Sequence, residues 1–241
     1  MWLFKSSVGR KVIMSVSGVG LVLFLFFHMS MNLVALFSAE YYNLICKFLG
    51  ANWYALVGTV GLAALVLVHF VYAFILTIQN RRARGSQRYA IDERPKGVSW
   101  ASQNMLVLGL IVILGLGLHL FNFWSKMQLP EIQHLYLGMD VDTKYAADGA
   151  YHIINTFKNP YYSAVYVVWL VALWFHLTHG FWSAMQTLGV NNKAWFCRWK
   201  AIGNVFVTVV ILGFLAVVVA GYAGCISPEA AEVAASVCPN A

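Results

Sequence analysis

Residues 17–32 of this chain read SGVGLVLFLFFHMSMN and place one histidine, His28, inside a strongly apolar run. No charged residue occurs between Lys11 and Glu40. A histidine inside hydrocarbon is costly unless its ring nitrogens find a partner, and a metal ion can bind the lone pair of a neutral imidazole. We therefore interpret His28 as a candidate functional residue.

The whole chain has the composition of an integral membrane protein. Its 241 residues are 61% hydrophobic and only 10% charged, and the mean hydropathy is +0.70, which is outside the range of ordinary soluble domains. Five uncharged runs hold 28 to 34 residues each, more than the roughly 20 that cross a bilayer. The first run is too long for a signal peptide and is expected to stay as a helix. We predict an all-α fold, a single membrane domain over residues 1–241, with five transmembrane helices at about 12–37, 53–79, 100–125, 161–186 and 201–223.

The basic residues are distributed unevenly between the segments that connect these helices. If the N-terminus is inside, the inner segments hold 12 of the 16 lysines and arginines, and the outer segments hold only Lys47, Lys126, Lys144 and Lys158. This bias predicts a cytoplasmic N-terminus and an outside C-terminus. It also explains the net charge of +7 without nucleic acid, and a basic inner face suits an acidic soluble partner or anionic membrane lipids.

The outer segments contain further titratable groups. Residues 126–160 carry several acids and two histidines, but no metal-ligand spacing recurs, so we expect a solvated cap over the membrane domain. Cys225 and Cys238 both fall in the outer tail and could pair if that side is oxidising, whereas Cys197 lies inside and would stay reduced. The sequence leaves the pairing open.

Three more histidines match His28 when their depth in the membrane is estimated from a helical rise of 1.5 Å per residue. His28 and His119 lie about 25 and 28 Å from the inner ends of their helices, and His69 and His179 about 16 and 15 Å. His176 is one turn further out than His179 and shares much of the same helix face, so it is a rival. The predicted pairs are therefore His28 with His119 and His69 with His179.

A single buried histidine usually forms a hydrogen bond with a backbone carbonyl or packs against a neighbouring helix. Here four histidines lie on four successive helices at two depths in the membrane. This pattern favours two haem b groups, each bound by two axial histidines. Two haems stacked this way would carry electrons across the bilayer. The sequence has no P-loop, no dinucleotide fingerprint and no flavin or iron–sulfur ligand set. We therefore expect a partner subunit to supply the catalytic domain.

Three motifs in the chain resemble a known family, the five-helix dihaem cytochrome b membrane anchors of succinate dehydrogenase and fumarate reductase. They are SSVGRKVIMSVSG at 6–18, leading to His28 and Asn32, RPKGVSWAS at 94–102, and HGFWSAMQTLG at 179–189. In that family each of the first four helices supplies one axial histidine, and a glycine directly follows the ligand of the fourth helix. The resemblance therefore implies His28, His69, His119 and His179 as iron ligands and favours His179 above His176.

The resemblance also implies partners and a location. It implies a flavoprotein subunit and an iron–sulfur subunit on the cytoplasmic face of a bacterial inner membrane. Electrons would pass between their succinate/fumarate site and a membrane quinone, most often menaquinone for this dihaem type, as part of the respiratory chain and tricarboxylic acid cycle. This chain would carry haem and quinone sites and no dicarboxylate site. The direction of the reaction and the oligomeric state of the complex stay open.

Residues that could contact the quinone or the haem propionates are less clearly marked. Hydrogen bonds or stacking to a quinone could come from Glu40, Tyr42, Asn32 and Trp53, although aromatic residues at such depths often belong to the interfacial belt. Cations for the propionates of the inner haem could be Arg10, Lys11 or Arg81.

Two other functions are compatible with the same residues. The chain could be the dihaem cytochrome b subunit of another quinone-linked membrane oxidoreductase, such as a hydrogenase or a nitrate reductase. It could also be a transporter in which intramembrane histidines relay protons, although the sequence lacks the inverted repeats and broken helices common in that class.

Overall fold

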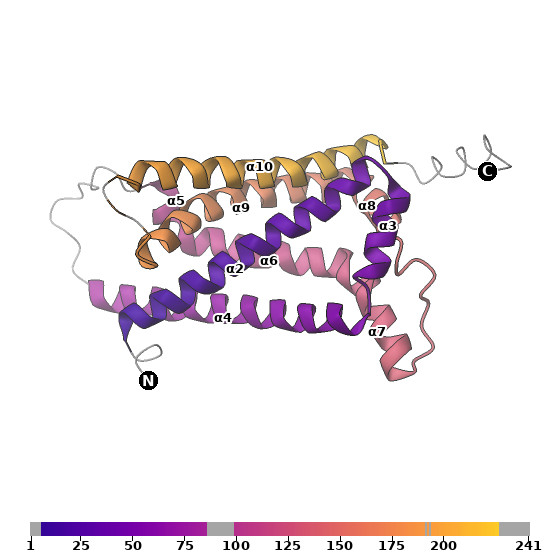
Figure 1. The fold of residues 1–241 in the computed structure, drawn as a ribbon, viewed down its shortest axis with the longest axis horizontal. Helices are drawn as coiled ribbons and strands as arrows, with labels where there is room; N and C mark the ends of the chain where they lie inside the picture. Colours follow the sequence, from indigo (N-terminus) through magenta and orange to yellow (C-terminus); the bar gives the residue numbers. More distant parts are fainter. Residues whose placement is uncertain (1–5, 86–98, 191, 193, 227–241) are drawn as a thin grey trace. The chain divides into compact units, whose positions relative to one another are not determined.

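The structure is a computed structural model that describes residues 6–85, 99–190, 192 and 194–226. Within these residues it is all helical, with no strand, and the predicted fold class is confirmed. Five helices are long and apolar enough to cross a membrane (Figure 1). They are α2 (Ser7–Leu33), α4 (Trp53–Arg84), α6 (Met105–Asn122), α9 (Pro160–Thr187) and α10 (Phe196–Ala223).

The observed helix bounds differ from the predicted ones mainly at the ends that we predict to lie inside. Helix α2 begins at Ser7 instead of residue 12 because the hydroxyl of Ser6 accepts a hydrogen bond from the backbone N–H of Gly9 at 2.9 Å and caps the first turn. Helix α4 continues to Arg84 and α10 already begins at Phe196. The predicted helix at 100–125 is divided into α5 (Trp100–Gln103) and α6, and Ser99 caps α5 through the N–H of Ser102.

The described residues cluster into two compact units. Unit 1 consists of Met1–Phe24, Gly61–Val112 and Ala172–Thr208, and unit 2 consists of Leu25–Val60, Ile113–Val171 and Val209–Ala241. Each of the five long helices contributes one part to each unit. The boundary between the two units therefore cuts through the helices and not through the loops that connect them. The single membrane domain over residues 1–241 stays a prediction.

In unit 1, α5, α6 and α9 pack around a small apolar cluster. Ala101, Leu108 and Ala172 form its buried centre, and the rings of Trp100 and Phe175 pack edge to face at 5.2 Å. The indole N–H of Trp174 donates to the hydroxyl of Thr208 at 2.9 Å and ties α9 to α10. These contacts hold the part of α9 that carries His176 and His179.

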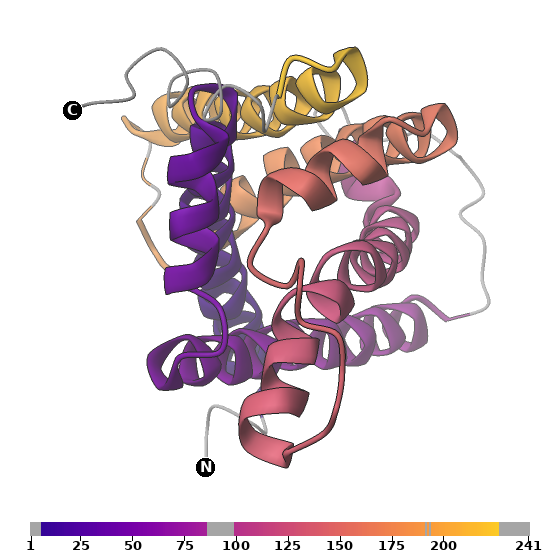
Figure 2. The same cartoon turned by 90° about the vertical axis from the view of Figure 1, so that its right-hand side faces the viewer.

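Unit 2 contains three short helices that the sequence analysis did not predict as such. They are α3 (Ala39–Phe48), α7 (Gln128–Leu137) and α8 (Gly149–Phe157), with the 3₁₀ turns Val34–Leu36 and Trp124–Lys126 next to them. Helices α3 and α8 pack together, as Figure 2 shows from one end. The segment that we expected as a solvated cap thus contains two helices, and one of them, α8, has a buried face, because Ile153 and Phe157 are only 1% and 4% exposed.

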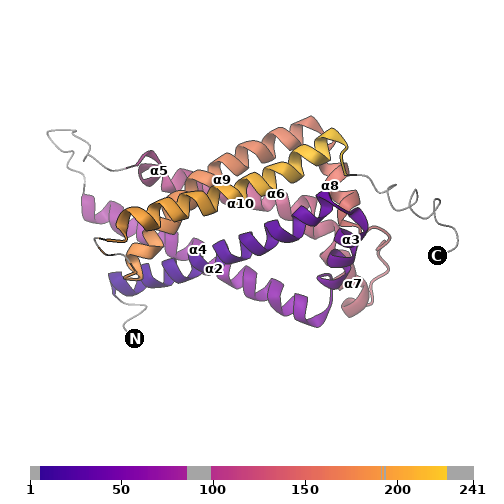
Figure 3. The same ribbon diagram turned by 45° about the horizontal axis from the view of Figure 1, so that its top comes forward.

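Helix α7 is held against the turn between α3 and α4 (Figure 3). Glu131 accepts a hydrogen bond from the N–H of Ala51 at 2.8 Å, and Tyr136 donates to the carbonyl of Ala51 at 2.8 Å. Gln128 donates to the carbonyl of Gly50 at 2.8 Å. Gly138 ends α7 in the left-handed conformation, with φ +62°, which a residue without Cβ adopts at little cost.

Candidate functional site

Unit 2 brings together the first predicted pair of histidines. His28 of α2 and His119 of α6 have ring centroids 5.8 Å apart and nearly perpendicular planes, at 86°. The ring of Phe214 from α10 lies 5.8 Å from His28. The two imidazoles therefore lie side by side, edge to face, in apolar surroundings, as the depth estimate predicts, and metal ligation stays a prediction.

Aromatic rings surround His119. The centroids of Phe123, Trp169 and Tyr166 lie 5.1, 5.9 and 6.3 Å from that of His119. The amide of Asn122 donates to the hydroxyl of Tyr166 at 3.3 Å, and both side chains are buried. No motif in the sequence singles out these residues. Their spacing is the ordinary pattern of an apolar helix, so only the fold identifies them as the wall of the site.

His28 is connected to a polar chain that includes two of the proposed quinone residues. The hydroxyl of Tyr42 donates to the side-chain oxygen of Asn32 at 2.8 Å, and the amide nitrogen of Asn32 donates to the backbone carbonyl of His28 at 2.7 Å. The same nitrogen lies 3.5 Å from Nδ1 of His28. Asn32 and Tyr42 thus use their hydrogen-bonding groups on each other and on His28, which gives them a structural role next to this histidine.

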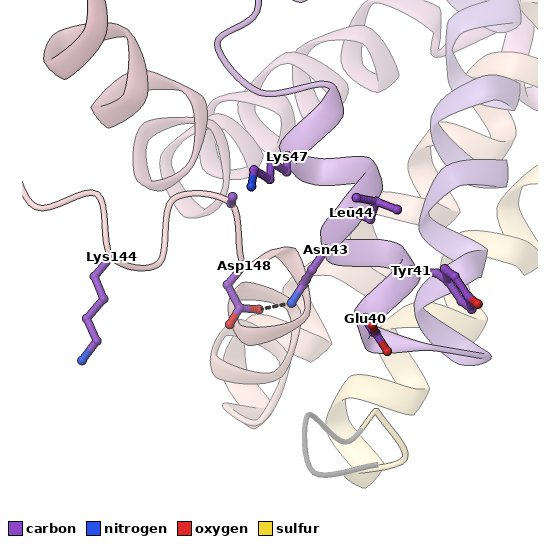
Figure 4. Close-up of a pocket in the computed structure, with 8 residues that line it drawn as sticks. Glu40, Tyr41, Asn43, Leu44, Lys47, Lys144 and Asp148 are labelled. Atoms are coloured by element: carbon purple, nitrogen blue, oxygen red, sulfur yellow. Dashed lines mark hydrogen bonds between the residues drawn. The ribbon is translucent and has the colours of Figure 1, made fainter. Parts of the chain in front are cut away.

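The other two proposed quinone residues lie elsewhere in unit 2. Glu40 is exposed and lines an open pocket of about 380 Å³ with Asn43, Lys47, Lys144 and Asp148 among others (Figure 4). Within it, the amide of Asn43 donates to Asp148 at 2.9 Å. Trp53 is 73% exposed and packs edge to face on Tyr54 at 5.8 Å.

Unit 1 holds the second set of histidines, and here the closest pair differs from the predicted one. The ring of His69 on α4 lies 6.4 Å from that of His176 on α9, at an interplanar angle of 68°. Nδ1 of His176 is buried and has no hydrogen-bond partner. His179 is half-buried one turn along α9. The direct ring contact with His69 is therefore made by the rival, His176.

Small residues leave room for the unit 1 histidines. A Cβ at Gly18 would lie 3.2 Å from Cε1 of His69, and a Cβ at Gly109 would lie 3.7 Å from Cε1 of His176. The hydroxyl of Ser17 lies 3.1 Å from Nδ1 of His69. The cations proposed for the propionates also belong to unit 1: Lys11 and Arg81 are exposed, and Arg10 is half-buried.

The two pairs fit a metal that takes two protein ligands. Two metal–imidazole bonds of about 2.1 Å on opposite sides of one ion place the ring centroids roughly 6 Å apart, and the observed separations are 5.8 and 6.4 Å. Among the described residues, no group of three or more His, Cys, Asp or Glu side chains could hold a metal. Two imidazoles suit haem iron, because the porphyrin occupies the remaining four positions. The orphaned Nδ1 of His176 adds a buried polar atom in need of a partner.

Two titratable residues of unit 2 lie outside the membrane-spanning helices and have shifted pKa values. Burial raises the pKa of Glu131, and the hydrogen bond from Ala51 partly offsets this. Burial lowers the pKa of His152, whose Nε2–H donates to the carbonyl of Tyr145 at 3.0 Å. His134 is exposed. Glu131 and His152 thus make their hydrogen bonds to backbone groups of unit 2.

Comparison of the chain with known protein families, with curated proteins and with solved structures found no match.

Proposed function

We propose that this chain is the membrane anchor and electron-transfer subunit of a succinate:quinone oxidoreductase and binds two haem b groups. The observation that carries the proposal is the pair of neighbouring imidazoles in each unit, with ring centroids 5.8 Å apart for His28 and His119 and 6.4 Å apart for His69 and His176. Each pair joins two different membrane-spanning helices. The motifs quoted above support the choice of family.

In this proposal the chain's own residues bind and orient the two groups. His28 and His119 hold one iron, with Phe123, Tyr166 and Trp169 excluding water around His119. His69 and one histidine of α9 hold the other. The resemblance favours His179 for this role, and the ring contact favours His176. Haem iron, when bound, supplies one-electron chemistry between its ferric and ferrous states.

The proposed partners follow from what this chain lacks and from the resemblance. A flavoprotein subunit and an iron–sulfur subunit dock on the basic inner face of a bacterial cytoplasmic membrane, and menaquinone is the membrane substrate. The half-buried Asn32 contacts His28 and the buried Tyr42 contacts Asn32, so both are candidate quinone contacts of unit 2.

The first test is haem quantitation on the purified protein and on single histidine variants. We expect two haems per chain in the wild type. His28→Ala and His119→Ala each lose the same haem, and His69→Ala loses the other. Of His176→Ala and His179→Ala, the variant that also loses the second haem identifies the α9 ligand. His134→Ala is the matched control, because His134 is exposed on α7, and it keeps both haems.

A chain without haem, or a haem content that is indifferent to His28 and His119, would overturn the proposal. Purification of the intact complex tests the partners. We expect the complex to contain a flavin and iron–sulfur clusters, and we expect succinate to reduce both haems. Nickel or molybdenum in the complex would assign the cytochrome to another oxidoreductase, and a protein with no Soret absorption would favour the proton-relay transporter.

A further inference from the structure

A buried serine lies directly against one of the proposed iron ligands. Ser17 of α2 is only 2% exposed, in a stretch that is otherwise apolar. Its hydroxyl donates to the carbonyl of Met14 at 3.0 Å, and its oxygen lies 3.1 Å from Nδ1 of His69 on α4. All three residues belong to unit 1. A hydroxyl buried in this way acts on the histidine through a specific hydrogen bond.

The direction of that bond follows from the number of protons available. A serine hydroxyl has one proton, and here it is donated to Met14. Nδ1 of His69 must then be the donor to the serine oxygen. In a neutral ring the proton is thus on Nδ1, and Nε2 keeps its lone pair.

The neighbouring residue limits where the ring can lie. A Cβ at position 18 would come within 3.2 Å of Cε1 of His69, which is tighter than an ordinary van der Waals contact. With glycine at this position, the imidazole lies against the backbone of α2, next to the point where the oxygen of Ser17 accepts the hydrogen bond from Nδ1–H. The hydrogen bond sets the tautomer, and the close backbone contact sets the position of the ring.

We propose that Ser17 and Gly18 act together as positioning residues that fix the ring orientation and the Nδ1–H tautomer of His69, so that Nε2 is presented to iron. This inference rests on the proposed function and deepens it for the unit 1 site. Outer partners of this kind typically change metal affinity by about 10–100-fold when they are removed.

The main experiment compares haem release from Ser17→Ala and Ser17→Thr to an excess of apomyoglobin. We expect Ser17→Ala to release one of its two haems about 10–100-fold faster than the wild type, with an altered ferric low-spin EPR signal for that haem only. Ser17→Thr keeps a hydroxyl and restores slow release. The unchanged second haem reports that each variant is folded.

Two control variants separate this role from general helix packing. Ser30 of α2 also donates its hydroxyl to a backbone carbonyl, that of Phe26 at 2.8 Å, so Ser30→Ala should leave the release of both haems unchanged. Gly18→Ala should speed release of the unit 1 haem, because the added methyl displaces the ring of His69. Gly20→Ala crowds Leu65 of α4 instead, at 2.9 Å, and should leave haem release unchanged.

A second measurement does not depend on haem. Nitrogen-15 NMR of the histidine-labelled, haem-free protein should report the Nδ1–H tautomer for His69 in the wild type and its loss in Ser17→Ala. If the tautomer and the haem release are both unchanged in Ser17→Ala, the inference is wrong even though the wild type binds two haems. If the wild type binds no haem, the proposed function fails, and the NMR result still decides whether Ser17 sets the tautomer.

Discussion

A buried tyrosine of α3 begins the hydrogen-bond chain that ends at His28. Burial holds the pKa of Tyr42 above its ordinary value, so its hydroxyl keeps its proton and can donate to Asn32 at 2.8 Å. The side-chain amide of Asn32 in turn donates to the carbonyl of His28. The hydroxyl of Tyr42 thus holds the side chain of Asn32 in the position from which it contacts His28, a proposed iron ligand.

Removing this hydroxyl should therefore have a measurable cost. We expect Tyr42→Phe to lower the free energy of unfolding by about 0.5–1.5 kcal/mol, the usual net value of one intramolecular hydrogen bond. Thermal unfolding in detergent measures it. Tyr41→Phe is the control, because Tyr41 is 66% exposed. An equal effect in both variants would show that the bond to Asn32 adds no stability.

His152 of α8 should make the stability of the cap depend on pH. Burial lowers its pKa from the ordinary value of 6.5, Lys126 lowers it further, and the Tyr145 carbonyl and Asp148 partly offset both. As the pH falls through 6.5, the unfolded chain therefore gains a proton that the folded chain resists, and stability is lost. At higher pH the ring is neutral in both states.

The measurement is the unfolding midpoint between pH 8 and pH 5. The wild type should lose stability on the acid side, and His152→Gln should show a shallower dependence. His134→Gln should keep the wild-type slope, because His134 is exposed on α7. The same slope in His152→Gln and the wild type would rule out His152 as the group responsible.

At the scale of the helices, α6 and α9 approach each other closely in unit 2. A Cβ at Gly115 of α6 would collide with the indole ring of Trp169 on α9. The same indole lies 5.9 Å from the ring of His119. Glycine at position 115 therefore lets a large side chain pack next to the histidine, and this contact is a property of two helices together.

We expect Gly115→Ala to destabilise the protein by about 1–3 kcal/mol through overpacking and to shift the spectrum of the unit 2 haem, because Trp169 must move. Thermal unfolding and the reduced-minus-oxidised spectrum measure the two effects. Gly58 of α4 is exposed and has open space around it, so Gly58→Ala should be neutral or slightly stabilising. No difference between the two variants would contradict the close packing at Trp169.

At the scale of the whole molecule, five apolar helices make the chain a multi-pass membrane protein. Large apolar side chains remain exposed along these helices, for example Leu23, Val57 and Leu114 at 62%, 66% and 74%. Exposing such side chains costs free energy in water, whereas contact with lipid tails does not. The orientation in the membrane is a prediction from the bias of basic residues.

Cysteine labelling tests this orientation. Cys197 and Cys225 are both exposed, close to the two ends of α10. In intact cells of a Cys238→Ser variant, which removes the possible partner of Cys225, a membrane-impermeant maleimide should label Cys225. It should reach Cys197 only after the membrane is permeabilised. The reverse pattern would place the N-terminus outside.

The sequence alone determined the fold class and which two histidines, His28 and His119, lie side by side in unit 2. An uncharged run of about 30 residues in a bilayer forms a helix, because lipid offers no hydrogen bonds to the backbone N–H and C=O groups and a helix pairs them within the segment. Helical rise then converts sequence position into depth. For His28 and His119 depth was sufficient, since each is the only histidine on its helix.

Only the tertiary structure decided the contacts that depend on how a helix is rotated and what folds beside it. His176 and His179 differ by less than a turn along α9, and the packing of α9 decides that His176 makes the ring contact with His69. In the sequence, Ser17 and Gly18 are ordinary small residues of an apolar helix. Their contact with His69 depends on how α2 and α4 pack together. The cap helices, and with them the bond between Tyr42 and Asn32, depend on buried contacts between distant segments that helical periodicity does not encode.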